Sequence, residues 1–258
     1  MSKRNEEIMH FTQKREDTMM CIREKLQSYT EVGTGEPIEK ENLVEFHLLY
    51  AGELLGSGNK KPRPDEKHSL RRKFHPQLRR LWECSKNLNY FAQSRSLSLW
   101  QEKHPDIDLQ TLAADKFRLR LAGIESISYQ WERAGFNFVP LVTENLCLRC
   151  RIEILFLRPE EKQYIMKSAD LDARLKTVFD ALRIPANLSE TGDMKPQEGE
   201  NPFFCLLADD KLISEVSINT GQLLMLPGRQ EINANDAFLV IRIQINHVNP
   251  TGIDQYFG

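Results

Sequence analysis

The sequence predicts a mixed α/β domain of the α+β kind, in which helices pack on a mixed sheet. Three observations lead to this prediction. Apolar and polar residues alternate in the segment 146–159, as they do in half-buried strands, and 211–218 also has a strand-like pattern. Between them lies 168–185, whose apolar residues recur every three to four positions, as in a surface helix. Strand-like and helix-like segments also follow one another along the rest of the chain. Such an order is typical of a sheet covered by helices.

Composition indicates a globular domain in a reducing compartment. Of the 258 residues, 40% are hydrophobic, which suffices for a sizeable core, and the formal net charge is −2. No run approaches the roughly 18 apolar residues of a membrane span, and the start of the chain lacks the apolar stretch of a signal peptide. Five cysteines, an odd number, favour free thiols. We therefore expect a cytoplasmic protein without membrane contact.

The chain divides into an N-terminal helical extension, 1–41, and a larger domain, 42–258. The extension has the pattern of one polar helix, and a loop with glycine and proline ends it. Its apolar residues at loosely helical intervals are Ile8, Phe11, Met19, Ile22 and Leu26. The larger domain begins with an expected strand, 43–54, and continues into an irregular segment, 56–76.

Helices are inserted in this domain, within about 76–122. The first is expected to begin near Pro76, because proline suits a first helical turn. The second is expected to begin near Asp106 or Asp108, either of which could cap it. Strand patterns resume at Ile124.

The strands after the helices differ in how clearly they alternate. Residues 126–142 are expected to pair as a hairpin that turns at Ala134 and Gly135. The segment 146–159 alternates most clearly, and one of its faces would carry Leu148, Cys150, Ile152, Ile154 and Phe156. No second pair of metal ligands follows its CLRC motif, so we assign these thiols to strand packing rather than to zinc.

The helix 168–185 is followed by 184–208, which has no apolar period. This segment is rich in Pro, Gly, Asn and Ser, so a long loop is expected. A loop of this length inside a compact domain is usually functional or mobile. Two further strands, 211–218 and 237–246, would complete the sheet.

Asp170 and Asp172 stand at the start of the expected helix, on either side of a leucine. One interpretation is structural. Asp170 caps the helix, and Asp172 is stabilised by the positive end of the helix dipole and pairs with Lys176 at i+4. The other is a metal site. Two helical residues at this spacing lie about 200° apart and cannot share an ion, whereas in extended backbone they point the same way. A shared metal therefore requires residues 170–172 to be a non-helical lead-in.

A second acidic pair, Asp209 and Asp210, comes directly before the expected strand 211–218. Mg²⁺ prefers about six oxygen ligands and keeps several waters, so two or three carboxylates suffice when phosphate supplies further oxygens. A cation held in this way lowers the pKa of bound water and neutralises charge on a phosphodiester. Lys176, one turn from Asp172, would hold a phosphate oxygen or stabilise the transition state. The pattern therefore favours a metal-dependent nuclease site.

These residues resemble the RusA-like Holliday junction resolvases, a family of endodeoxyribonucleases. The resemblance covers about 149–218 and consists of a strand, DLD, a lysine after three further residues, FDAL, a connection, and DD before a strand. It implies that Asp170, Asp172 and Asp210 bind the metal and are catalytic, and that Lys176 is needed for cleavage. It also implies an α/β fold, a homodimer, Mg²⁺ or Mn²⁺ as the cofactor, and branched DNA as the substrate, in DNA recombination or DNA repair.

The sequence departs from the family pattern in three respects. The chain is longer than is usual in the family, the connection between FDAL and DD is longer, and Ala173 stands where the family usually has Asn. Ala173 keeps a second hypothesis open, a non-cleaving nucleic-acid-binding module of the same fold in recombination or phage defence. A nuclease directed at RNA is a third, because carboxylate–Mg²⁺ chemistry does not itself choose the sugar.

A basic run, 60–80, supplies the expected contacts to DNA phosphates. The residues assigned to this role are Lys60, Lys61, Arg63, Arg71, Arg72 and Lys73. A solvated basic loop without a ligand is the alternative. The predicted carboxylate site favours the DNA-binding interpretation, because acidic ligands alone would repel DNA.

Overall fold

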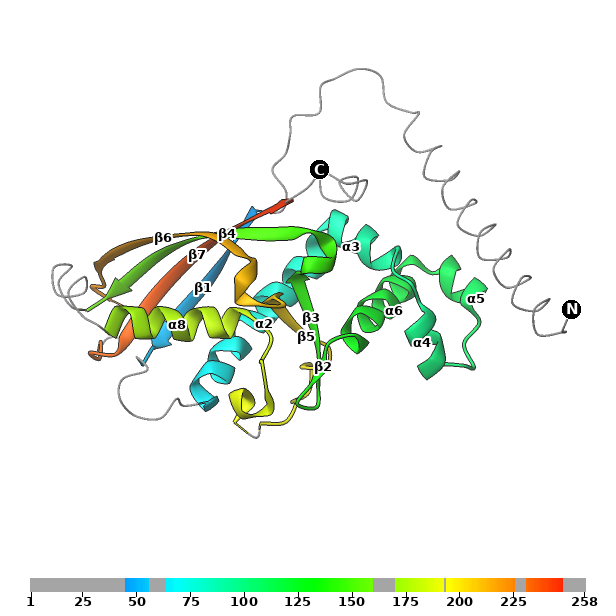
Figure 1. Ribbon diagram of the computed structural model, residues 1–258, viewed down its shortest axis with the longest axis horizontal. Helices are drawn as coiled ribbons and strands as arrows, with labels where there is room; N and C mark the ends of the chain where they lie inside the picture. Colours follow the sequence, from blue (N-terminus) through cyan, green and yellow to red (C-terminus); the bar gives the residue numbers. More distant parts are fainter. Residues whose placement is uncertain (1–44, 56–63, 160–169, 193, 226–230, 248–258) are drawn as a thin grey trace, which may run out of the picture. The chain divides into compact units, whose positions relative to one another are not determined.

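The computed structural model describes residues 45–55, 64–159, 170–192, 194–225 and 231–247. The expected helical extension, 1–41, lies outside the described residues, so its helix stays a prediction. Within 42–258 the chain combines helices with two sheets, and the predicted mixed α/β class is confirmed (Figure 1).

A four-stranded sheet in the order β1-β7-β4-β6 forms the main layer. Its strands are β1 (Glu45–Glu53), β4 (Leu148–Arg158), β6 (Ile213–Gln222) and β7 (Asp236–His247). The alternation predicted for 146–159 is confirmed, because every second side chain from Leu148 to Phe156 is buried. These side chains pack with those of β7 and of the helices beneath the sheet into one hydrophobic core.

Helix α8 (Asp170–Leu182) lies beneath the sheet beside helix α2 (Pro64–Cys84) (Figure 1). It follows β4 in the chain, and β4 pairs in parallel with β6. Parallel strands require the chain to return between them, so α8 runs back along the sheet from the end of β4 toward the start of β6. The apolar stripe of α8 faces the core: Leu175, Val178 and Leu182 are buried.

A smaller sheet, in the order β2-β3-β5, adjoins the helices. Its strands are β2 (Glu132–Arg133), β3 (Phe136–Val142) and β5 (Phe203–Leu207). The predicted turn between the first two is confirmed: Ala134 and Gly135 have φ of 55° and 77°. Two positive φ angles in succession are typical of the tight turns that join antiparallel strands.

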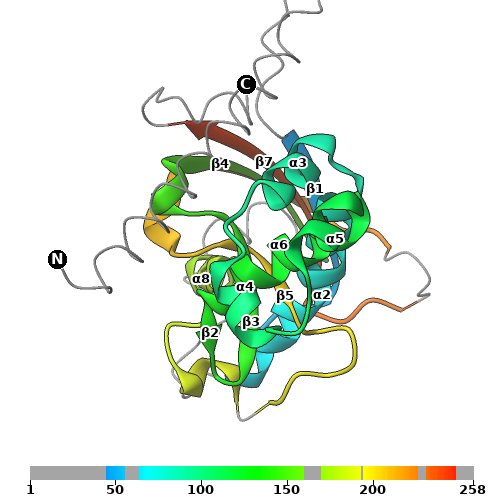
Figure 2. The ribbon, with the colours of Figure 1, turned by 90° about the vertical axis from the view of Figure 1, so that its right-hand side faces the viewer.

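Four shorter helices gather at one end of the 42–258 part, the end that faces the viewer in Figure 2. They are α3 (Lys86–Gln93), α4 (Ser98–Lys103), α5 (Leu109–Ala114) and α6 (Lys116–Tyr129). Asp108 caps α5 by accepting from two backbone N–H groups, as predicted. None of the described helices combines the length and the apolar character that crossing a bilayer requires.

Helix α2 begins earlier than predicted, at Pro64 instead of near Pro76, and Pro76 lies inside it. The segment 56–76 is thus helical over its second part. The apolar stripe explains the difference, because Leu70, Phe74 and Leu78 recur at every fourth position and are all buried. This burial outweighs the one backbone hydrogen bond that a proline removes.

Two segments expected as strand and loop form other structures. Residues 126–129 belong to α6, where the hydroxyl groups of Ser126 and Ser128 donate to backbone carbonyl oxygens and are thereby satisfied inside the protein. The expected loop 184–208 contains β5, whose sequence FFCLL is buried throughout. A short continuous apolar run is typical of a strand covered on both faces, and it has no period to reveal it.

Gly123 of α6 marks a close approach to α3: a Cβ atom built there would lie 1.9 Å from the carbonyl oxygen of Ala92. We expect Gly123→Ala to lower the free energy of unfolding by about 1–3 kcal/mol, because the clash is with backbone. Helix propensity alone predicts the opposite, a gain of about 1 kcal/mol. Equilibrium denaturant unfolding measures the change, with the exposed Arg118→Ala as the control. Unchanged or higher stability of Gly123→Ala would contradict this contact.

Candidate functional site

The residues predicted to bind a metal lie at the start of α8 and just before β6. Helix α8 begins at Asp170, so Asp170 and Asp172 both belong to its first turn. The extended lead-in that a shared ion requires is therefore not formed at this point. The side chain of Asp170 lies outside the described part of the structure.

Asp172 and Lys176 are exposed and stand one helical turn apart. Within the described ranges, neither side chain takes part in a hydrogen bond or an ion pair. The structural i+4 pair considered from the sequence is thus not formed. One turn of α8 presents a carboxylate and an ammonium group that are both available to a ligand.

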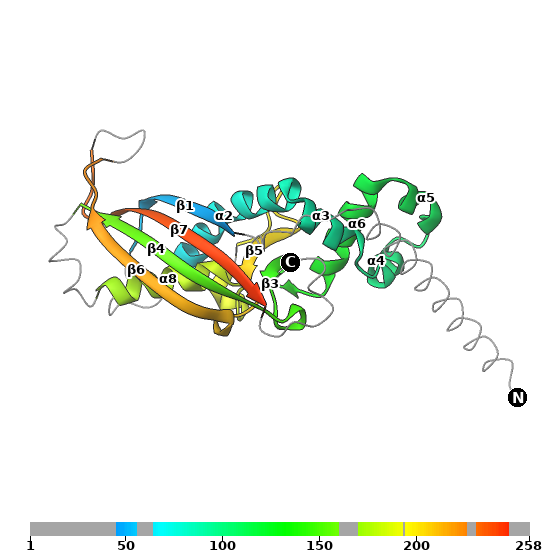
Figure 3. The same ribbon diagram turned by 90° about the horizontal axis from the view of Figure 1, so that it is seen from above.

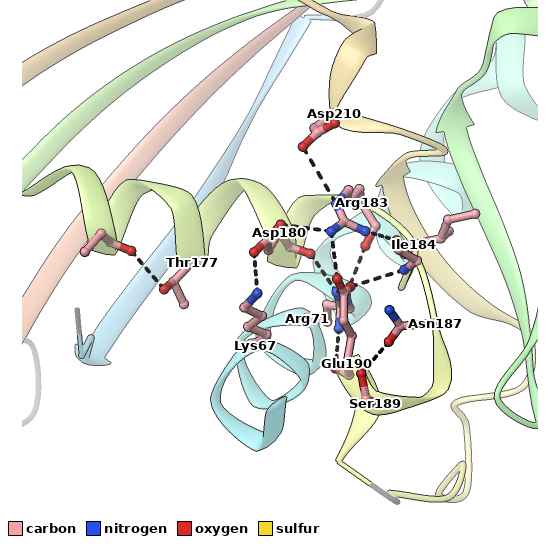
Figure 4. A network of polar contacts seen from close by, with 12 residues as sticks. Lys67, Arg71, Thr177, Asp180, Arg183, Ile184, Asn187, Ser189, Glu190 and Asp210 are labelled. Atoms are coloured by element: carbon pink, nitrogen blue, oxygen red, sulfur yellow. Dashed lines mark hydrogen bonds and ion pairs between the residues drawn. The ribbon is translucent and has the colours of Figure 1, made fainter. Parts of the chain in front are cut away.

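Asp210 begins η3 (Asp210–Leu212), the single turn that leads into β6. Its carboxylate is 57% exposed and lies 3.9 Å from Nε of Arg183, the residue that follows α8 (Figure 4). Asp209 caps the same turn, because its Oδ1 accepts from the backbone N–H of Lys211 at 3.0 Å. Of the second acidic pair, Asp209 therefore has a structural role and Asp210 faces an arginine.

The structure places Asp172 and Asp210 toward opposite ends of α8. Asp210 lies beside Arg183, eleven residues after Asp172, and a helix rises 1.5 Å per residue, so about 16 Å of helix separates the two acids. A Mg²⁺ ion with ligands at about 2.0–2.1 Å cannot bind both. Within the described residues, no group of three or more His, Cys, Asp or Glu is placed to hold a metal. Asp172 and Asp210 are thus not brought together in this conformation, and the metal-binding role predicted for Asp170 stays a prediction.

The basic residues predicted to bind DNA occupy different environments. Lys60, Lys61 and Arg63 lie outside the described residues, so their role stays a prediction. Arg71 is buried, and its guanidinium group donates to the carbonyl oxygens of Asp180, Arg183 and Glu190, at 2.7, 3.0 and 3.1 Å in that order. The structure gives Arg71 an internal role in place of the predicted DNA contact.

Arg72 is also engaged inside the protein. It donates to the carboxylate of Glu200 and to the carbonyl oxygen of Lys195, each at 3.0 Å. Of the three predicted DNA contacts that the structure describes, Lys73 alone is exposed. Arg71 and Arg72 thus hold the segment 184–202 against α2, and this segment is anchored where the sequence predicted a functional or mobile loop.

A network of charged side chains that the sequence did not predict surrounds Arg71 (Figure 4). Asp180, which its spacing places on the polar face of α8, is buried and accepts from Lys67 and Arg183. Glu190 accepts from Arg183 and Arg71, at 2.9 and 3.2 Å. Lys67 and Arg71 precede their partners by more than 100 residues, so no local pattern could reveal these pairs.

Electrostatics keep the acids of this network charged. Burial alone would raise the pKa of Asp180, but the hydrogen bond from Lys67 and the charges of Lys67 and Arg183 lower it. Burial also opposes ionisation of Glu190, and the bonds from Arg183 and from the backbone of Ala186 lower its pKa. Both carboxylates therefore remain ionised and join α8 to α2 and to η2 (Leu188–Thr191).

A hollow of about 230 Å³ lies between the end of β1, the first turns of α2 and the middle of α8. Its lining carries three acids and one cation near Thr177 of α8; the charged residues are Glu53, Asp65, Glu66 and Lys73. Negative charge repels phosphate, so the hollow is a poor place for a DNA backbone. The exposed turn with Asp172 and Lys176 is the more suitable one.

His68 and His75 of the basic run are buried in the fold. Nδ1 of His75 accepts from the backbone N–H of Phe204 at 2.9 Å. His68 packs between the rings of Phe136 and Phe203, with centroids 4.9 and 5.6 Å away. Within the described part of the chain its ring nitrogens have no hydrogen-bond partner, and burial lowers its pKa to about 4. The ring of His68 therefore serves packing, and the ring of His75 also bonds to the backbone of Phe204 and Gly199.

Comparison with known proteins reveals no relative: no protein-family model, no curated protein and no solved structure matches the chain. The resemblance to RusA-like resolvases therefore depends on the motif residues between about 149 and 218, and it stays a prediction.

The network around Arg71 predicts an uneven response to the loss of arginines. Arg71→Met leaves three backbone carbonyl groups without the guanidinium donor and removes one of the donors to Glu190, so we expect it to lower the free energy of unfolding by about 3–5 kcal/mol. Arg80 pairs with Glu83 on the surface, and Arg80→Met should cost less than about 1 kcal/mol. Urea unfolding of both variants measures the difference. Equal costs would show that the buried arginine is not a structural support.

The burial of His68 predicts lower stability at mildly acidic pH. His68 titrates at about 4 in the fold and near its ordinary pKa of 6.5 in the unfolded chain. Between these values the unfolded state binds a proton that the folded state does not, so stability falls as the pH falls, by about 3 kcal/mol at most. Asp180 and Glu190, whose pKa values the fold lowers, act in the same direction toward the acidic end of this window, because the unfolded chain protonates these acids first.

His68→Phe should therefore show a shallower loss of stability between pH 6.5 and 4. His75, whose pKa burial also lowers, and the two acids are unchanged in this variant and give the remaining slope. Urea unfolding at a series of pH values measures both slopes. The same slope in both proteins would mean that His68 binds its proton equally well folded and unfolded.

Proposed function

We propose that the chain is a Mg²⁺-dependent, RusA-like endodeoxyribonuclease that hydrolyses phosphodiesters in branched DNA. The observation that carries the proposal is the exposed turn of α8 with Asp172 and Lys176, which are unpaired within the described residues. If the two residues served only the helix, they would be expected to bond to each other. They are instead free to receive a cation and a phosphate.

The two side chains have different roles in the proposed site. Mg²⁺ in proteins typically binds one or two carboxylates together with waters and substrate phosphate oxygens, so Asp172 fits as one ligand. When bound, the cation supplies a more acidic water and neutralises charge on the phosphodiester. Lys176 binds a phosphate oxygen and positions the DNA backbone against α8. Asp210 fits no shared ion with Asp172, and no step is assigned to it.

A cytoplasmic setting is part of the proposal. Cys84, Cys147, Cys150 and Cys205 have free thiols, and free thiols are usual in a reducing compartment. Cys150 and Cys205 are buried, and burial raises the pKa of each thiol to about 12. The thiols of Cys150 and Cys205 therefore stay protonated, which favours packing over metal binding.

A non-cleaving DNA-binding module is the second candidate, and the separation of Asp172 from Asp210 favours it. The family pattern implies three carboxylates on a common metal, whereas here about 16 Å of helix separates Asp172 from Arg183, beside which Asp210 lies. Ala173 also replaces the usual Asn of the family and removes a polar group beside Asp172. Such a module would bind branched DNA through lysines and leave it intact.

Cleavage of labelled four-way junction, linear duplex and single-stranded DNA, with Mg²⁺ or with EDTA, separates the candidates. We expect Mg²⁺-dependent cutting of junctions, and a loss of about 100-fold or more in Asp172→Asn and in Lys176→Ala. Asp172→Asn should bind DNA as well as the original protein or better, because a repulsive charge is removed. Asp210→Asn is the matched control, and its cleavage rate should be nearly unchanged.

Each of the other outcomes supports a different function or mechanism for the chain. Tight binding without cutting by the original chain supports the non-cleaving module. Full activity of Asp172→Asn removes the proposed mechanism. An equal loss in Asp210→Asn would show that the chain closes into a form in which Asp210 joins Asp172. Cutting of a labelled single-stranded RNA, included in the same assay, in place of DNA would reassign the substrate.

A further inference from the structure

A second hollow, of about 210 Å³, lies between the last turns of α2, the middle of α6 and the segment 199–204 that leads into β5. Helix α6 lies at the opposite end of the 42–258 part from the first turn of α8, so this hollow is separate from the proposed metal site (Figure 3). Sites for drug-sized molecules measure about 300–1,000 Å³. The space therefore suits one small ring system.

The walls of this hollow are largely apolar. Trp82, Ile124 and Phe204 contribute buried side chains, and Leu121 of α6 is 41% exposed. Buried walls around a small opening favour a flat apolar body over a hydrated ion.

Two buried N–H groups of the lining lack a partner within the described residues. They are Nε1 of Trp82, a residue that is 2% exposed, and Nε of Arg120. Another nitrogen of Arg120, Nη1, donates to the side-chain oxygen of Asn89 at 3.2 Å. Buried donors in proteins nearly always bond to protein, water or ligand. The hollow therefore favours a ligand that carries acceptor atoms on one edge.

The acids of the lining favour a neutral acceptor over an anion. Glu83 accepts from Arg79 and Arg80 at 3.1 and 3.4 Å. Glu125 accepts from Nε1 of Trp100 at 2.7 Å. Both carboxylates are thus engaged, but they would still repel a charged ligand inside the hollow. A neutral carbonyl group meets the free donors without this repulsion.

Positive charge and an exposed ring border the hollow. The side chain of Arg79 is 50% exposed. The guanidinium group of Arg120 lies over the ring of Phe117, 5.0 Å from its centroid, and Phe117 is 62% exposed. Arginine is a common partner of nucleic-acid phosphates, and exposed aromatic rings stack on unpaired bases. The border of the hollow therefore suits a strand that continues beyond it.

We propose that this hollow binds one unpaired base of a single-stranded nucleic acid. Carbonyl groups of the base accept from Trp82 and Arg120, Arg79 holds a neighbouring phosphate, and the next base stacks on Phe117. Thymine and guanine carry such carbonyl groups on their edges. The base has to be unpaired, because only an unstacked base can enter a pocket of this kind.

The inference rests on the proposed contact of the chain with DNA, but not on cleavage. It adds a substrate preference to that function, namely for branches that carry a single-stranded arm. A free nucleoside has the same base chemistry. The strand is the favoured source, because Arg79 and Phe117 lie where further nucleotides would continue.

The indole N–H signals of the full chain in an NMR spectrum test the proposal. The chain has three tryptophans, and the Trp82 signal is assigned by its loss in Trp82→Phe. In EDTA, we expect a short oligothymidine to shift this signal. An abasic strand of the same length should leave it in place, because phosphates alone do not fill the hollow. Trp131, which does not line the hollow, is the internal control.

Free thymidine separates the two sources of the base. It should shift the same signal only at about tenfold or higher concentration, because it lacks the phosphate and the second base. Thymidine that binds as tightly as the oligonucleotide would overturn the choice of a strand. A Trp82 signal that oligothymidine leaves unmoved at saturation, or that the abasic strand moves equally, would overturn the site itself.

Two variants test the border of the hollow by fluorescence anisotropy. Arg120→Lys keeps the charge and removes the Nε–H, and Phe117→Ala removes an exposed ring. Each should weaken the binding of oligothymidine by about fivefold or more and leave that of the abasic strand unchanged. The matched controls are Arg118→Lys on α6 and Leu109→Ala on α5, both exposed, and they should bind as the original chain does.

Variants that bind oligothymidine like their controls would contradict the proposal. Circular dichroism shows whether each variant is folded, and the exposed Phe117 keeps the test valid if Trp82→Phe does not fold. Cleavage of junctions without a shift of the Trp82 signal would remove this site and leave the nuclease proposal intact. A shift without cleavage would keep this site and support the non-cleaving module.

Discussion

Parallel pairing of β4 with β6 is the constraint on which the arrangement of the site depends. Strands that run the same way need a connection that returns along the sheet, and α8 forms part of that return. Its first turn therefore lies toward the end of β4, and its last turn lies toward the start of β6. Two acidic motifs on either side of this helix are kept apart by its length. The chemistry available at one end, Asp172 with Lys176, is separate from that at the other, Asp210 with Arg183.

The buried charges around Arg71 hold α8 in this position between β4 and β6. Arg71 donates to carbonyl oxygens just at the end of α8, and Lys67 and Arg183 hold Asp180. A buried ion pair is weak evidence for net stability, because removing charges from water costs about as much as their attraction returns. Its effect here is positional. The network sets α2 against α8 and anchors the segment that leads to β5.

Local patterns in the sequence predicted the parts of the fold that local physics decides. The alternation in 146–159 and the helical period in 168–185 both gave buried faces, and Asp108 and the Ala134–Gly135 turn behaved as their residue types require. Patterns failed where the deciding partner is distant. FFCLL has no period, so β5 was assigned to a loop.

The same limit applies to the candidate site. The direction of Arg71 depends on carbonyl groups more than 100 residues away, and no property of a basic run distinguishes an inward arginine from an outward one. The distance from Asp172 to Asp210 depends on strand order, which the spacing of the motifs does not contain. What the sequence did predict is the exposed, acidic start of α8 with its lysine one turn later.

The central claim is that a divalent cation binds at the start of α8 without help from Asp210. Paramagnetic broadening by Mn²⁺, followed residue by residue in the NMR spectrum of the full chain, tests it most directly. The account predicts strong broadening of the amide signals of Leu171–Lys176, with those of η3 (Asp210–Leu212) much less affected, because about 16 Å of helix separates Asp172 from Arg183, beside which Asp210 lies. Equal broadening at both places would contradict the account, and so would a spectrum without broadening at α8.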